Sequence, residues 1–491
     1  MLLDMAVSGF GDRTAFGSVG NGLTYADLLE RSSRAGHAFS QAGTERVSFL
    51  DVSSPALPVA LFGAAYAGQP FVPLNYRLAD NDLVALAERT SPASIVAGQD
   101  QAPRVASVSG LSLSDRDGFL TATESGEALE PSGWPMDPDD IAVLLYTSGT
   151  TGAPKAAVLR HKNLVGYILG SVEFMGAGEH EATLVSVPPY HIAGLAAILS
   201  SVYAGRRVVQ LPNFDADTWI DLVASEGVTH AMVVPTMLAR IVERMTERSI
   251  SLPSLQALSY GGGRMPLPVI EQALALFPET RFVNAYGLTE TSSTISLLGP
   301  DDHRSAHASN DAAIRRRLTS VGQPLPTLEV SIRSEEGAEV PAGTPGEVWV
   351  RGEQVAGEYL QQGSKLTPDG WFPTNDGGEL DGDGYLYVTG RLDDVIVRGG
   401  ENISPGEIED VLLAHPGVRD VAVIGIPNDQ WGETIGAVVV GSASESDLKA
   451  HVAERLRSSR SPDTVLYRDE LPYNDTGKLL RRVLRAELTE Q

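Results

Sequence analysis

Residues 146–155 bring together the side-chain types that bind phosphate groups. The segment reads Tyr-Thr-Ser-Gly-Thr-Thr-Gly-Ala-Pro-Lys and lies between two apolar runs. Glycines let backbone N–H groups face an anion, hydroxyls add donors, and a lysine adds a compact positive charge. The order of residues differs from the Walker A pattern G-x-x-x-x-G-K-[ST]. We interpret the segment as a polyphosphate-binding loop rather than a hairpin turn without function, because ordinary turns rarely combine these side chains. Its candidate ligands are Thr147, Ser148, Gly149, Thr150, Thr151, Gly152 and Lys155.

A second motif, residues 284–291, reads Asn-Ala-Tyr-Gly-Leu-Thr-Glu-Thr and follows a short strand-like stretch. Tyr286 can stack on a nucleobase and Thr289 can donate to a phosphate. The carboxylate of Glu290 can bind a hard cation such as Mg²⁺. Considered alone, the motif is explained equally well as a strand end with one buried tyrosine and one exposed glutamate.

Three further motifs each carry weak evidence when taken alone. The glycine turn at residues 261–263 allows a flat ligand to approach the backbone closely. Asp376 suits a ribose diol, and Arg391 offers a second polar group. Lys478 stands on a glycine turn in a chain that takes most of its positive charge from arginine. A structural turn, a local cap and a solvated lysine are the competing and more common interpretations.

The elements that must position these residues alternate between short apolar strands and helices, which predicts an α/β fold with a largely parallel sheet. Strands are expected at residues 47–52, 70–73, 141–145, 183–187, 207–211 and 230–234, and helices at 26–42, 56–66, 218–226 and from 195 onward. Residues 328–332 and 346–351 predict antiparallel strands of a smaller β region. Residues 299–317 predict an exposed loop or weak helix, and the Pro, Gly and Asp residues of 367–384 predict turns.

A compact unit follows from about residue 403 and has the size of one small domain. Helices are expected there at residues 404–414 and 446–456, and strands at 418–426 and 435–440. We place the boundary between the two domains at residues 391–394.

The composition narrows the class of protein. The chain has 491 residues, of which 42% are hydrophobic, so two or more domains are expected. The net charge of −26 argues against nucleic acid or an anionic membrane as a partner. There is no cysteine, so the thiol of any thioester chemistry must come from a substrate. With neither a signal-peptide pattern nor an apolar stretch of about 18 residues, a cytoplasmic protein is expected.

Taken together and in this order, the motifs resemble the adenylate-forming superfamily, which includes acyl- and aryl-CoA synthetases, adenylation domains of peptide synthetases and beetle luciferases. The resemblance extends over nearly the whole chain. It implies a large N-terminal domain of α/β subdomains plus a small β region (residues 1–390), a hinge (391–394) and a small mobile α+β C-terminal domain (395–491). It also implies two steps: a carboxylic acid and ATP give acyl-AMP and pyrophosphate, and a thiol then displaces AMP. Mg²⁺ and coenzyme A would be required.

The same resemblance implies a role for each candidate residue. The loop from Thr147 to Lys155 would surround the β- and γ-phosphates, and Tyr286 would stack on the adenine. Asp393 would be the hinge residue that exchanges Lys478 for the Gly399–Gly400 segment between the two steps. The implied catalytic residues are Lys478, Thr289, Glu290 (also the Mg²⁺ ligand) and His191. The remaining implied nucleotide and thiol ligands are Gly262, Gly263, Arg264, Asn284, Ala285, Gly287, Asp376, Arg391, Gly399, Gly400 and Glu401.

Two departures from the family pattern stand out. Asn375 occupies a position where the family often has glycine, which bears on the placement of Asp376. Arg264 and Met265 replace a commoner small residue and proline, which bears on the choice of substrate.

The acid itself is less defined. Tyr190, His191, Val234 and Pro235 suggest an apolar acyl pocket. No aspartate stands where amino-acid-activating domains pair the substrate ammonium, which disfavours amino acids. The leading hypothesis is an acid–CoA ligase, as in fatty acid metabolism, for a medium-chain, aryl or 2-succinylbenzoate-like acid.

Several alternatives remain open. One is an acyl-AMP ligase that loads a carrier protein, and another is a dicarboxylate (malonate-like) CoA ligase that uses Arg264. A luciferase-like oxygenase and a nucleotide-binding protein without catalysis are less favoured. A homodimer is the expectation from base rates.

Overall fold

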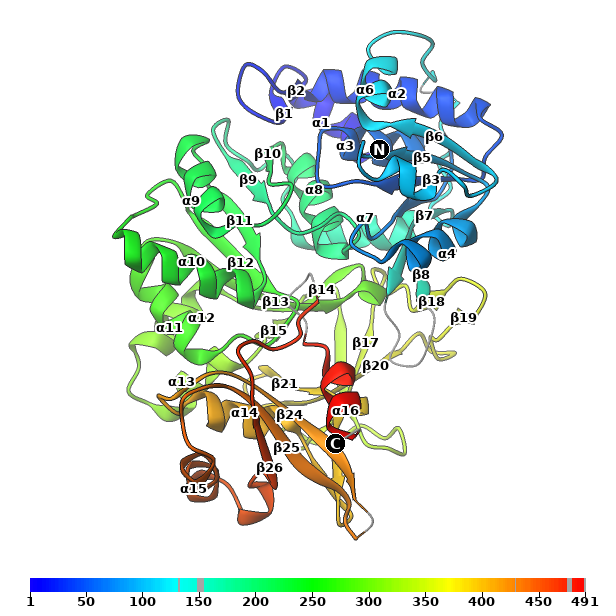
Figure 1. Ribbon diagram of the computed structural model, residues 1–491. Coiled ribbons are helices and arrows are strands. Elements are labelled where there is room, and N and C mark those ends of the chain that lie inside the picture. Colours follow the sequence, from blue (N-terminus) through cyan, green and yellow to red (C-terminus); the bar gives the residue numbers. More distant parts are fainter. Residues whose placement is uncertain (131–132, 148–153, 429, 475–478, 490–491) are drawn as a thin grey trace.

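The computed structural model describes residues 1–130, 133–147, 154–428, 430–474 and 479–489 (Figure 1). Within these ranges the strands form four sheets. No helix in the described part of the chain combines the length and the apolar character needed to cross a membrane.

One sheet has the strand order β19-β18-β8-β7-β4-β3-β5-β6. Strands β3 to β7 are parallel, whereas β7 and β8 form an antiparallel hairpin. The strands are β3 (Arg46–Leu50), β4 (Phe71–Pro73), β5 (Ala93–Ala97), β6 (Leu111–Asp115), β7 (Ile141–Thr147), β8 (Lys155–Arg160), β18 (Glu358–Tyr359) and β19 (Gly363–Ser364). The helices around it are α2 (Tyr25–Gln41), α3 (Ala56–Tyr66), α4 (Asp80–Thr90), α5 (Ala102–Val105) and α6 (Arg116–Ala122).

A second sheet has the order β15-β14-β13-β12-β11-β9-β10-β1-β2 and is parallel from β13 to β1. Its strands are β1 (Thr14–Phe16), β2 (Leu23–Thr24), β9 (Ala182–Val185), β10 (Arg207–Gln210), β11 (His230–Val233), β12 (Ala257–Gly261), β13 (Arg281–Leu288), β14 (Ser293–Leu298) and β15 (Gln323–Pro324). Its helices are α1 (Leu2–Phe10), α7 (His161–Ser171), α8 (Ile192–Ala204), α9 (Ala216–Ser225), α10 (Pro235–Arg248), α11 (Leu267–Leu276), α12 (Pro300–Ala308) and α13 (Ala312–Arg316).

These two sheets share one hydrophobic core. Helices α1, α2, α3 and α8 contribute to it together with strands of both sheets. Helix α3 is buried along almost its whole length, which explains why apolar residues occur on all its faces. Helices α9 to α11 cover the outer face of the second sheet, and α4 and α5 that of the first.

The other two sheets are smaller. The third is antiparallel, with the order β16 (Glu329–Arg333), β17 (Gly346–Arg351), β20 (Phe372–Leu380) and β21 (Leu386–Arg391). The fourth contains β22 (Ile396–Arg398), β23 (Glu401–Ile403), β24 (Val418–Asn428), β25 (Gly432–Gly441) and β26 (Thr464–Tyr467). A single 3₁₀ turn, Leu392–Asp394, separates the two.

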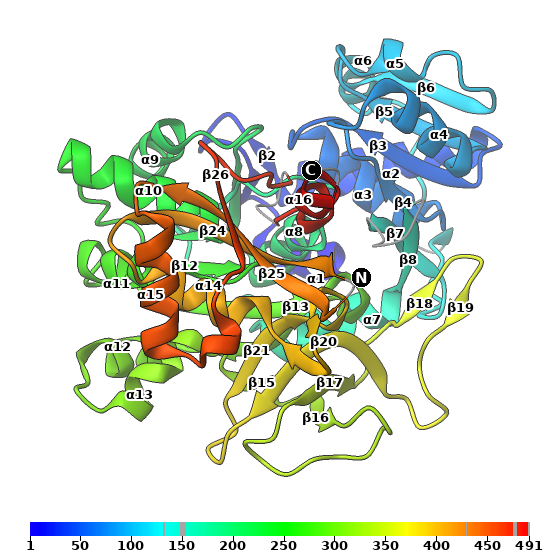
Figure 2. The same ribbon diagram turned by 60° about the horizontal axis from the view of Figure 1, so that its bottom comes forward.

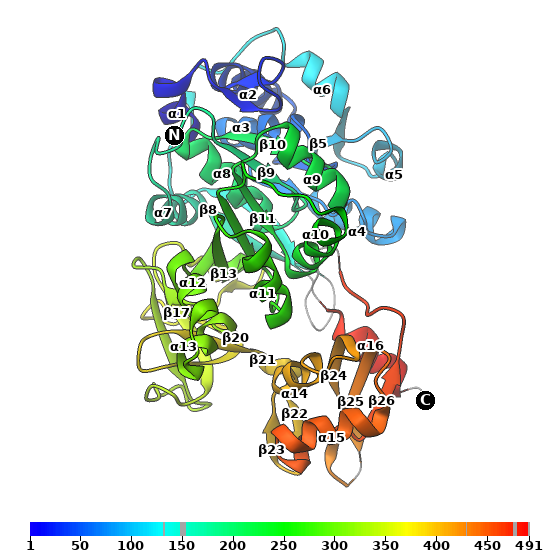
Figure 3. The same cartoon turned by 90° about the vertical axis from the view of Figure 1, so that its left-hand side faces the viewer.

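Alternating residues of β24 and β25 face opposite sides of the fourth sheet, as the two-residue period of a strand requires. One side packs against α14 (Pro405–Leu413) and α15 (Glu445–Arg455), and the other against α16 (Arg481–Thr489) (Figure 2). Figure 3 shows this unit beyond β21, with α14 next to the rest of the molecule.

One segment, predicted as an exposed loop or weak helix, forms a helix that is partly buried, and another differs from its prediction. Residues 300–308 form α12, in which His303 is fully buried, because its ring is held between Tyr260 and the carbonyl of Gly299. Residues 372–380 form β20 rather than turns, since pairing with β17 and β21 stabilises a strand that its Gly and Pro content disfavours. Asp376 therefore lies within a strand and not in a tight turn.

Candidate active site

The β7–β8 hairpin presents the two described ends of the predicted phosphate loop. Thr147 and Lys155 are opposite each other in the ladder, and the Thr147 hydroxyl donates to the Lys155 carbonyl at 3.4 Å. Arg89 supports this end, because it donates to the Pro154 carbonyl at 2.8 Å and lies over the Tyr146 ring. The predicted ligands Ser148, Gly149, Thr150, Thr151 and Gly152 lie outside the described residues.

Tyr359 connects this hairpin to the second motif. It lies on β18, which pairs with β8 at Ala157. Its hydroxyl donates to Oε1 of Glu290 at 2.6 Å, and Nζ of Lys155 lies 5.9 Å from the centroid of its ring. Burial, followed by the nearby Glu290 carboxylate, raises the pKa of Tyr359 above its ordinary value, which keeps the hydroxyl a proton donor. Lys155 and Glu290 thus both lie near one tyrosine.

Tyr359 was not predicted from the sequence. The residue belongs to a strand of two residues, which is too short to show an alternating pattern. A single tyrosine after a glycine and a glutamate gave no signal of its own.

Glu290 is held by its backbone as well as by Tyr359. The carbonyl of Glu290 accepts hydrogen bonds from the N–H groups of Ala356 and Gly357 at 2.9 and 3.1 Å. The next carbonyl, that of Thr291, accepts one from the buried Gln354 side chain at 3.0 Å. These bonds fix the short 3₁₀ turn Thr289–Thr291, so the Thr289 hydroxyl and the Glu290 carboxylate are presented from a rigid element.

Asp376 is the centre of a second group. Only 5% of it is exposed. Its Oδ2 accepts a hydrogen bond from the Tyr286 hydroxyl at 2.6 Å, and its Oδ1 one from Nη1 of Arg391 at 3.1 Å. Asp376 and Arg391 are direct partners in the β20–β21 ladder. Burial and the Asp376 carboxylate raise the pKa of Tyr286 well above its ordinary value.

The structure therefore brings together the three residues to which the resemblance assigns the ribose and the base. The contact joins the second sheet, which carries Tyr286 on β13, to the third sheet, which carries Asp376 and Arg391.

The predicted adenine turn lies beside the predicted acyl pocket. Gly262 has φ of +81°, and a Cβ atom added there would lie 3.6 Å from Cγ1 of Val234. Val234 is buried directly before α10, which begins at Pro235. Gly263 is exposed.

Neighbouring residues of β13 have packing roles. A Cβ atom at Gly287 would lie 1.7 Å from the Ser293 carbonyl oxygen, so only glycine fits. The buried Asn284 side chain donates to the Ser320 carbonyl at 3.1 Å. Ala285 is half-buried, and its carbonyl approaches Gly261 of the neighbouring strand.

His191 stands immediately before α8, and its carbonyl accepts the N–H of Gly194 at 3.0 Å. Its ring lies 4.6 Å from the ring of the buried Tyr190, which in turn contacts Tyr76 edge-on. His191 is half-buried at this position.

Arg264 contacts the C-terminal unit. Its guanidinium forms an ion pair with Asp410 on α14. A second contact across the same boundary joins the Ser404 hydroxyl to the Thr389 carbonyl at 2.9 Å. In this arrangement Arg264 extends toward α14.

The C-terminal unit presents the remaining predicted residues. Gly399 and Gly400, with φ of +58° and +82°, form the turn between β22 and β23, and Glu401 pairs with Arg460 at 2.9 Å. Lys478 lies outside the described residues. Further along the chain, Arg481 forms a bidentate ion pair with the buried Glu409, with N···O distances of 2.5 and 2.9 Å.

The hinge prediction falls on the 3₁₀ turn Leu392–Asp394. Oδ2 of Asp393 accepts a hydrogen bond from Nδ2 of Asn375 at 2.7 Å. Asp394 lies 3.6 Å from Nε of Arg481.

The donor set fits magnesium and a nucleotide. In the described part of the chain, no group of three or more His, Asp or Glu side chains could enclose a metal ion. Mg²⁺ is commonly held by one or two carboxylates together with the phosphates of its substrate. Glu290 provides one such carboxylate, and Thr289 and Lys155 are of the types that bind phosphate.

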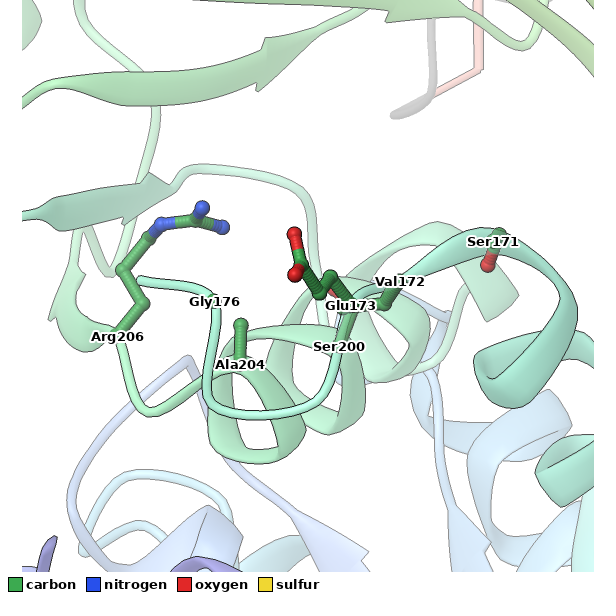
Figure 4. Close-up of a pocket in the computed structure, with 7 residues that line it drawn as sticks. All are labelled: Ser171, Val172, Glu173, Gly176, Ser200, Ala204 and Arg206. Carbon is green, nitrogen blue, oxygen red and sulfur yellow. The ribbon is translucent and has the colours of Figure 1, made fainter. Parts of the chain in front are cut away.

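A cavity of about 280 Å³ lies elsewhere, at the C-terminal end of α8 (Figure 4). Arg206 and Glu173 face it, and Arg206 is already paired with Glu181 at 2.8 Å. None of the predicted site residues lines this cavity.

Comparison with known proteins gives two family matches. Residues 3–360 match the AMP-binding enzyme family, and residues 407–478 match the AMP-binding enzyme C-terminal domain.

Among named relatives, a feruloyl-CoA synthase from Amycolatopsis is 34% identical, over 96% of this chain and 95% of its own. The fatty acid–[acyl-carrier-protein] ligase ScoC from Streptomyces coeruleorubidus is 32% identical, over 95% of this chain and 92% of its own. The solved structure of o-succinylbenzoate CoA synthetase (MenE) from Bacillus subtilis, in complex with its acyl-adenylate intermediate, is 29% identical and superimposes with a TM-score of 0.86, covering 99% of this chain and 97% of that one. The same enzyme has also been solved with ATP and a magnesium ion.

Proposed function

The chain belongs to the AMP-binding enzyme family, and we propose that it is an ATP-dependent acid–CoA ligase for an apolar carboxylic acid. The observation that carries this proposal is that Tyr359 lies near both Lys155 and Glu290, the residues that we propose to bind phosphate and magnesium. The ribose group around Asp376 supports it independently.

In the first step, a carboxylate oxygen of the acid attacks the α-phosphorus of ATP, and the bond to pyrophosphate breaks. Two anions approach each other, so positive charge must offset their repulsion in the transition state. Lys478 would supply this charge at the carboxylate and α-phosphate, while Lys155 and the hydroxyls of its loop bind the leaving pyrophosphate. Bound Mg²⁺ would neutralise phosphate charge, held by Glu290.

In the second step, the sulfur of coenzyme A attacks the acyl carbon, and AMP leaves with the electrons of the broken C–O bond. This step has no use for a lysine at the phosphate. We propose that rotation about Asp393 removes Lys478 and brings Gly399 and Gly400 to the thiol, so that one pocket serves both steps. The domains would accordingly span residues 1–390 and 395–491.

The proposed acyl pocket combines an apolar wall at Val234 and Tyr190 with His191 at its entrance. Named relatives act on acids with an aromatic ring or on fatty acids, which supports the same class here. We propose aryl, 2-succinylbenzoate-like and medium-chain acids as the first panel.

Pyrophosphate release on addition of ATP and an acid tests the first step, and consumption of free coenzyme A tests the second. Lys478→Ala is expected to slow pyrophosphate release by about 100-fold or more, because it removes charge from the transition state. Thioester formation from supplied acyl-AMP should change little.

The matched control is Lys449→Ala, a lysine of the same domain that pairs with Glu445. It should leave both steps unchanged. Normal pyrophosphate release by Lys478→Ala would contradict the proposed mechanism.

A carrier-protein loading activity is the second candidate, because ScoC is about as similar to this chain as the CoA ligases are. Acyl transfer to a phosphopantetheinyl carrier protein without consumption of free coenzyme A would identify it. The dicarboxylate alternative requires Arg264 to bind a second carboxylate, whereas the structure shows this residue paired with Asp410. The cytoplasmic location and the homodimer stay proposals, and sedimentation analysis tests the latter.

A further inference from the structure

Asn375 adopts a backbone conformation that is unusual for a residue with a side chain. Its φ is +60°, within strand β20 and directly before Asp376. Asparagine is among the few residues that tolerate this left-handed region, which glycine adopts freely. The backbone N–H of Asn375 donates to Oε1 of Glu347 at 2.9 Å, and the other oxygen of Glu347 accepts from Nε1 of Trp349 at 2.8 Å. Glu347, itself held by Trp349, therefore stabilises the backbone conformation of Asn375.

The side chain of Asn375 extends to the hinge. Asp376 faces Arg391 in the ladder, so the residue before Asp376 lies beside the turn that follows Arg391. There Nδ2 of Asn375 donates to Oδ2 of Asp393 at 2.7 Å. A hydrogen bond to an ionised acceptor is stronger than one between neutral groups. A glycine could provide the same backbone conformation but not this bond.

We propose that Asn375 is a positioning residue that holds the hinge residue Asp393 in the orientation seen here and links it to the ribose site through the adjacent Asp376. The inference deepens the proposed two-step function and rests on it. A ribose bound at Asp376 would lie one residue away from the hinge bond. Loss of the bond should favour the other orientation of the C-terminal domain and change the balance between the two half-reactions.

The simpler explanation is that Asn375 only completes a local bend of β20. A local role predicts that Asn375→Gly leaves the domains unaffected, because glycine keeps the backbone conformation. The two explanations therefore differ in what this one substitution does.

Spin labels can report the domain orientation directly, since the chain contains no cysteine. Ala275→Cys on α11 and Ala453→Cys on α15 place labels on exposed helix positions in the two domains. We expect Asn375→Gly to lower the ratio of the present orientation to the alternative about fivefold, the change that corresponds to about 1 kcal/mol. Gln361→Gly is the matched control, because Gln361 also has a positive φ, +69°, but lies between β18 and β19 of the first sheet.

A second experiment exchanges the side chains of Asn375 and Asp393. Asn375→Asp sets two carboxylates against each other and should shift the distances at least as far as Asn375→Gly. Adding Asp393→Asn restores one donor and one acceptor with the roles reversed, and should restore the distances. An unchanged distance distribution in Asn375→Gly, or no recovery in the double variant, would overturn the proposal.

Kinetics complete the test. The ratio of pyrophosphate release to thioester formation from acyl-AMP should move with the distances in each variant. The distances are measured without substrate, so an absence of acyl-AMP formation in the unmodified protein would contradict the ligase function while the hinge result remains readable.

Discussion

At the scale of single residues, Tyr359 shows how a side chain outside every recognised motif can organise the site. Its hydroxyl fixes the rotamer of Glu290, and its ring lies near the ammonium of Lys155. A carboxylate that is held in place loses less conformational freedom when it binds a metal ion. Residues that orient a metal ligand in this way commonly affect metal affinity without touching the metal.

Tyr359→Phe is therefore expected to raise the Mg²⁺ concentration for half-maximal pyrophosphate release by about tenfold. Thioester formation from acyl-AMP, which lacks the β- and γ-phosphates, should be unaffected. A titration of Mg²⁺ at fixed ATP measures the effect. Tyr467→Phe is the control, because its hydroxyl also donates a hydrogen bond, to the Ala443 carbonyl at 2.8 Å, but lies in the C-terminal domain. Equal Mg²⁺ requirements in both variants would contradict the role of Tyr359.

The motifs in the sequence pointed to Asp376, Arg391 and Tyr286, and the structure places the three in direct contact. The types of these residues and the order of their motifs were enough to assign them to one site. The engagement of Arg264 by Asp410 could not be predicted, because it joins surfaces of two domains whose relative orientation no local pattern encodes. The bond between Asn375 and Asp393 could not be predicted for another reason: it depends on the pairing of β20 with β21, and the sequence predicted turns where β20 forms.

At the scale of elements, the sequence predicted the buried strands and the most apolar helix well. Helix α3 has the expected bounds, because an uninterrupted apolar segment of this length has few alternatives. Strand β20 and the burial of helix α12 were harder to predict from the sequence. Partners distant in the sequence stabilise both against a composition rich in polar residues, and Arg304 anchors α12 by donating to the carbonyls of Leu274, Phe277 and Thr280.

Helix α12 should make the protein sensitive to acid. Nδ1 of His303 donates to the Gly299 carbonyl, so Nε2 accepts from Tyr260, which requires the neutral ring. Burial lowers the pKa of His303 from 6.5 to about 4. The unfolded chain therefore takes up a proton first as the pH falls. Stability from this residue is complete above pH 6.5 and is lost between 6.5 and 4.

Between pH 7 and pH 5 the loss from His303 alone should be about 2 kcal/mol in the free energy of unfolding. His303→Gln keeps polar atoms but has no proton to gain, so its stability should fall less over this range. Urea unfolding at both pH values measures the difference. The control is His180→Gln, at an exposed histidine. This variant should lose as much stability between pH 7 and pH 5 as the unmodified protein does. If His303→Gln lost as much stability between pH 7 and pH 5 as the unmodified protein, other groups would control the loss of stability in acid.

At the scale of the whole molecule, the contacts between the C-terminal unit and the rest include, among the residues that the structure describes, the Arg264–Asp410 ion pair and the Ser404–Thr389 hydrogen bond. The Arg264–Asp410 pair is about two-fifths exposed on each side, and exposed pairs typically contribute less than about 1 kcal/mol. Weak contacts suit the proposed change of orientation between the two steps, because each orientation would have to be left as easily as it is reached.

Arg264→Ala and Asp410→Ala should each shift the spin-label distances slightly and to the same extent, and the double variant should add nothing. This result is expected because both substitutions remove one shared interaction. High salt should abolish the difference in spin-label distances between each variant and the unmodified protein, because salt screens an exposed ion pair. If Arg264→Ala alone lost kcat/KM, and only toward dicarboxylic acids, Arg264 would instead be a substrate ligand.

The pairing of β18 with β8 also affects how the protein is made on the ribosome. The edge of the first sheet at β8 is covered by residues 358–359, about two hundred positions later in the chain (Figure 1). Until that segment has been synthesised, the nascent first sheet carries an open strand edge, the kind of surface on which chains aggregate. A chain released before residue 358 would lack both the cover for this edge and the tyrosine that holds Glu290. The edge of the first sheet at β8 can therefore be covered only after the chain has been synthesised through residue 359, although β8 itself is complete at residue 160.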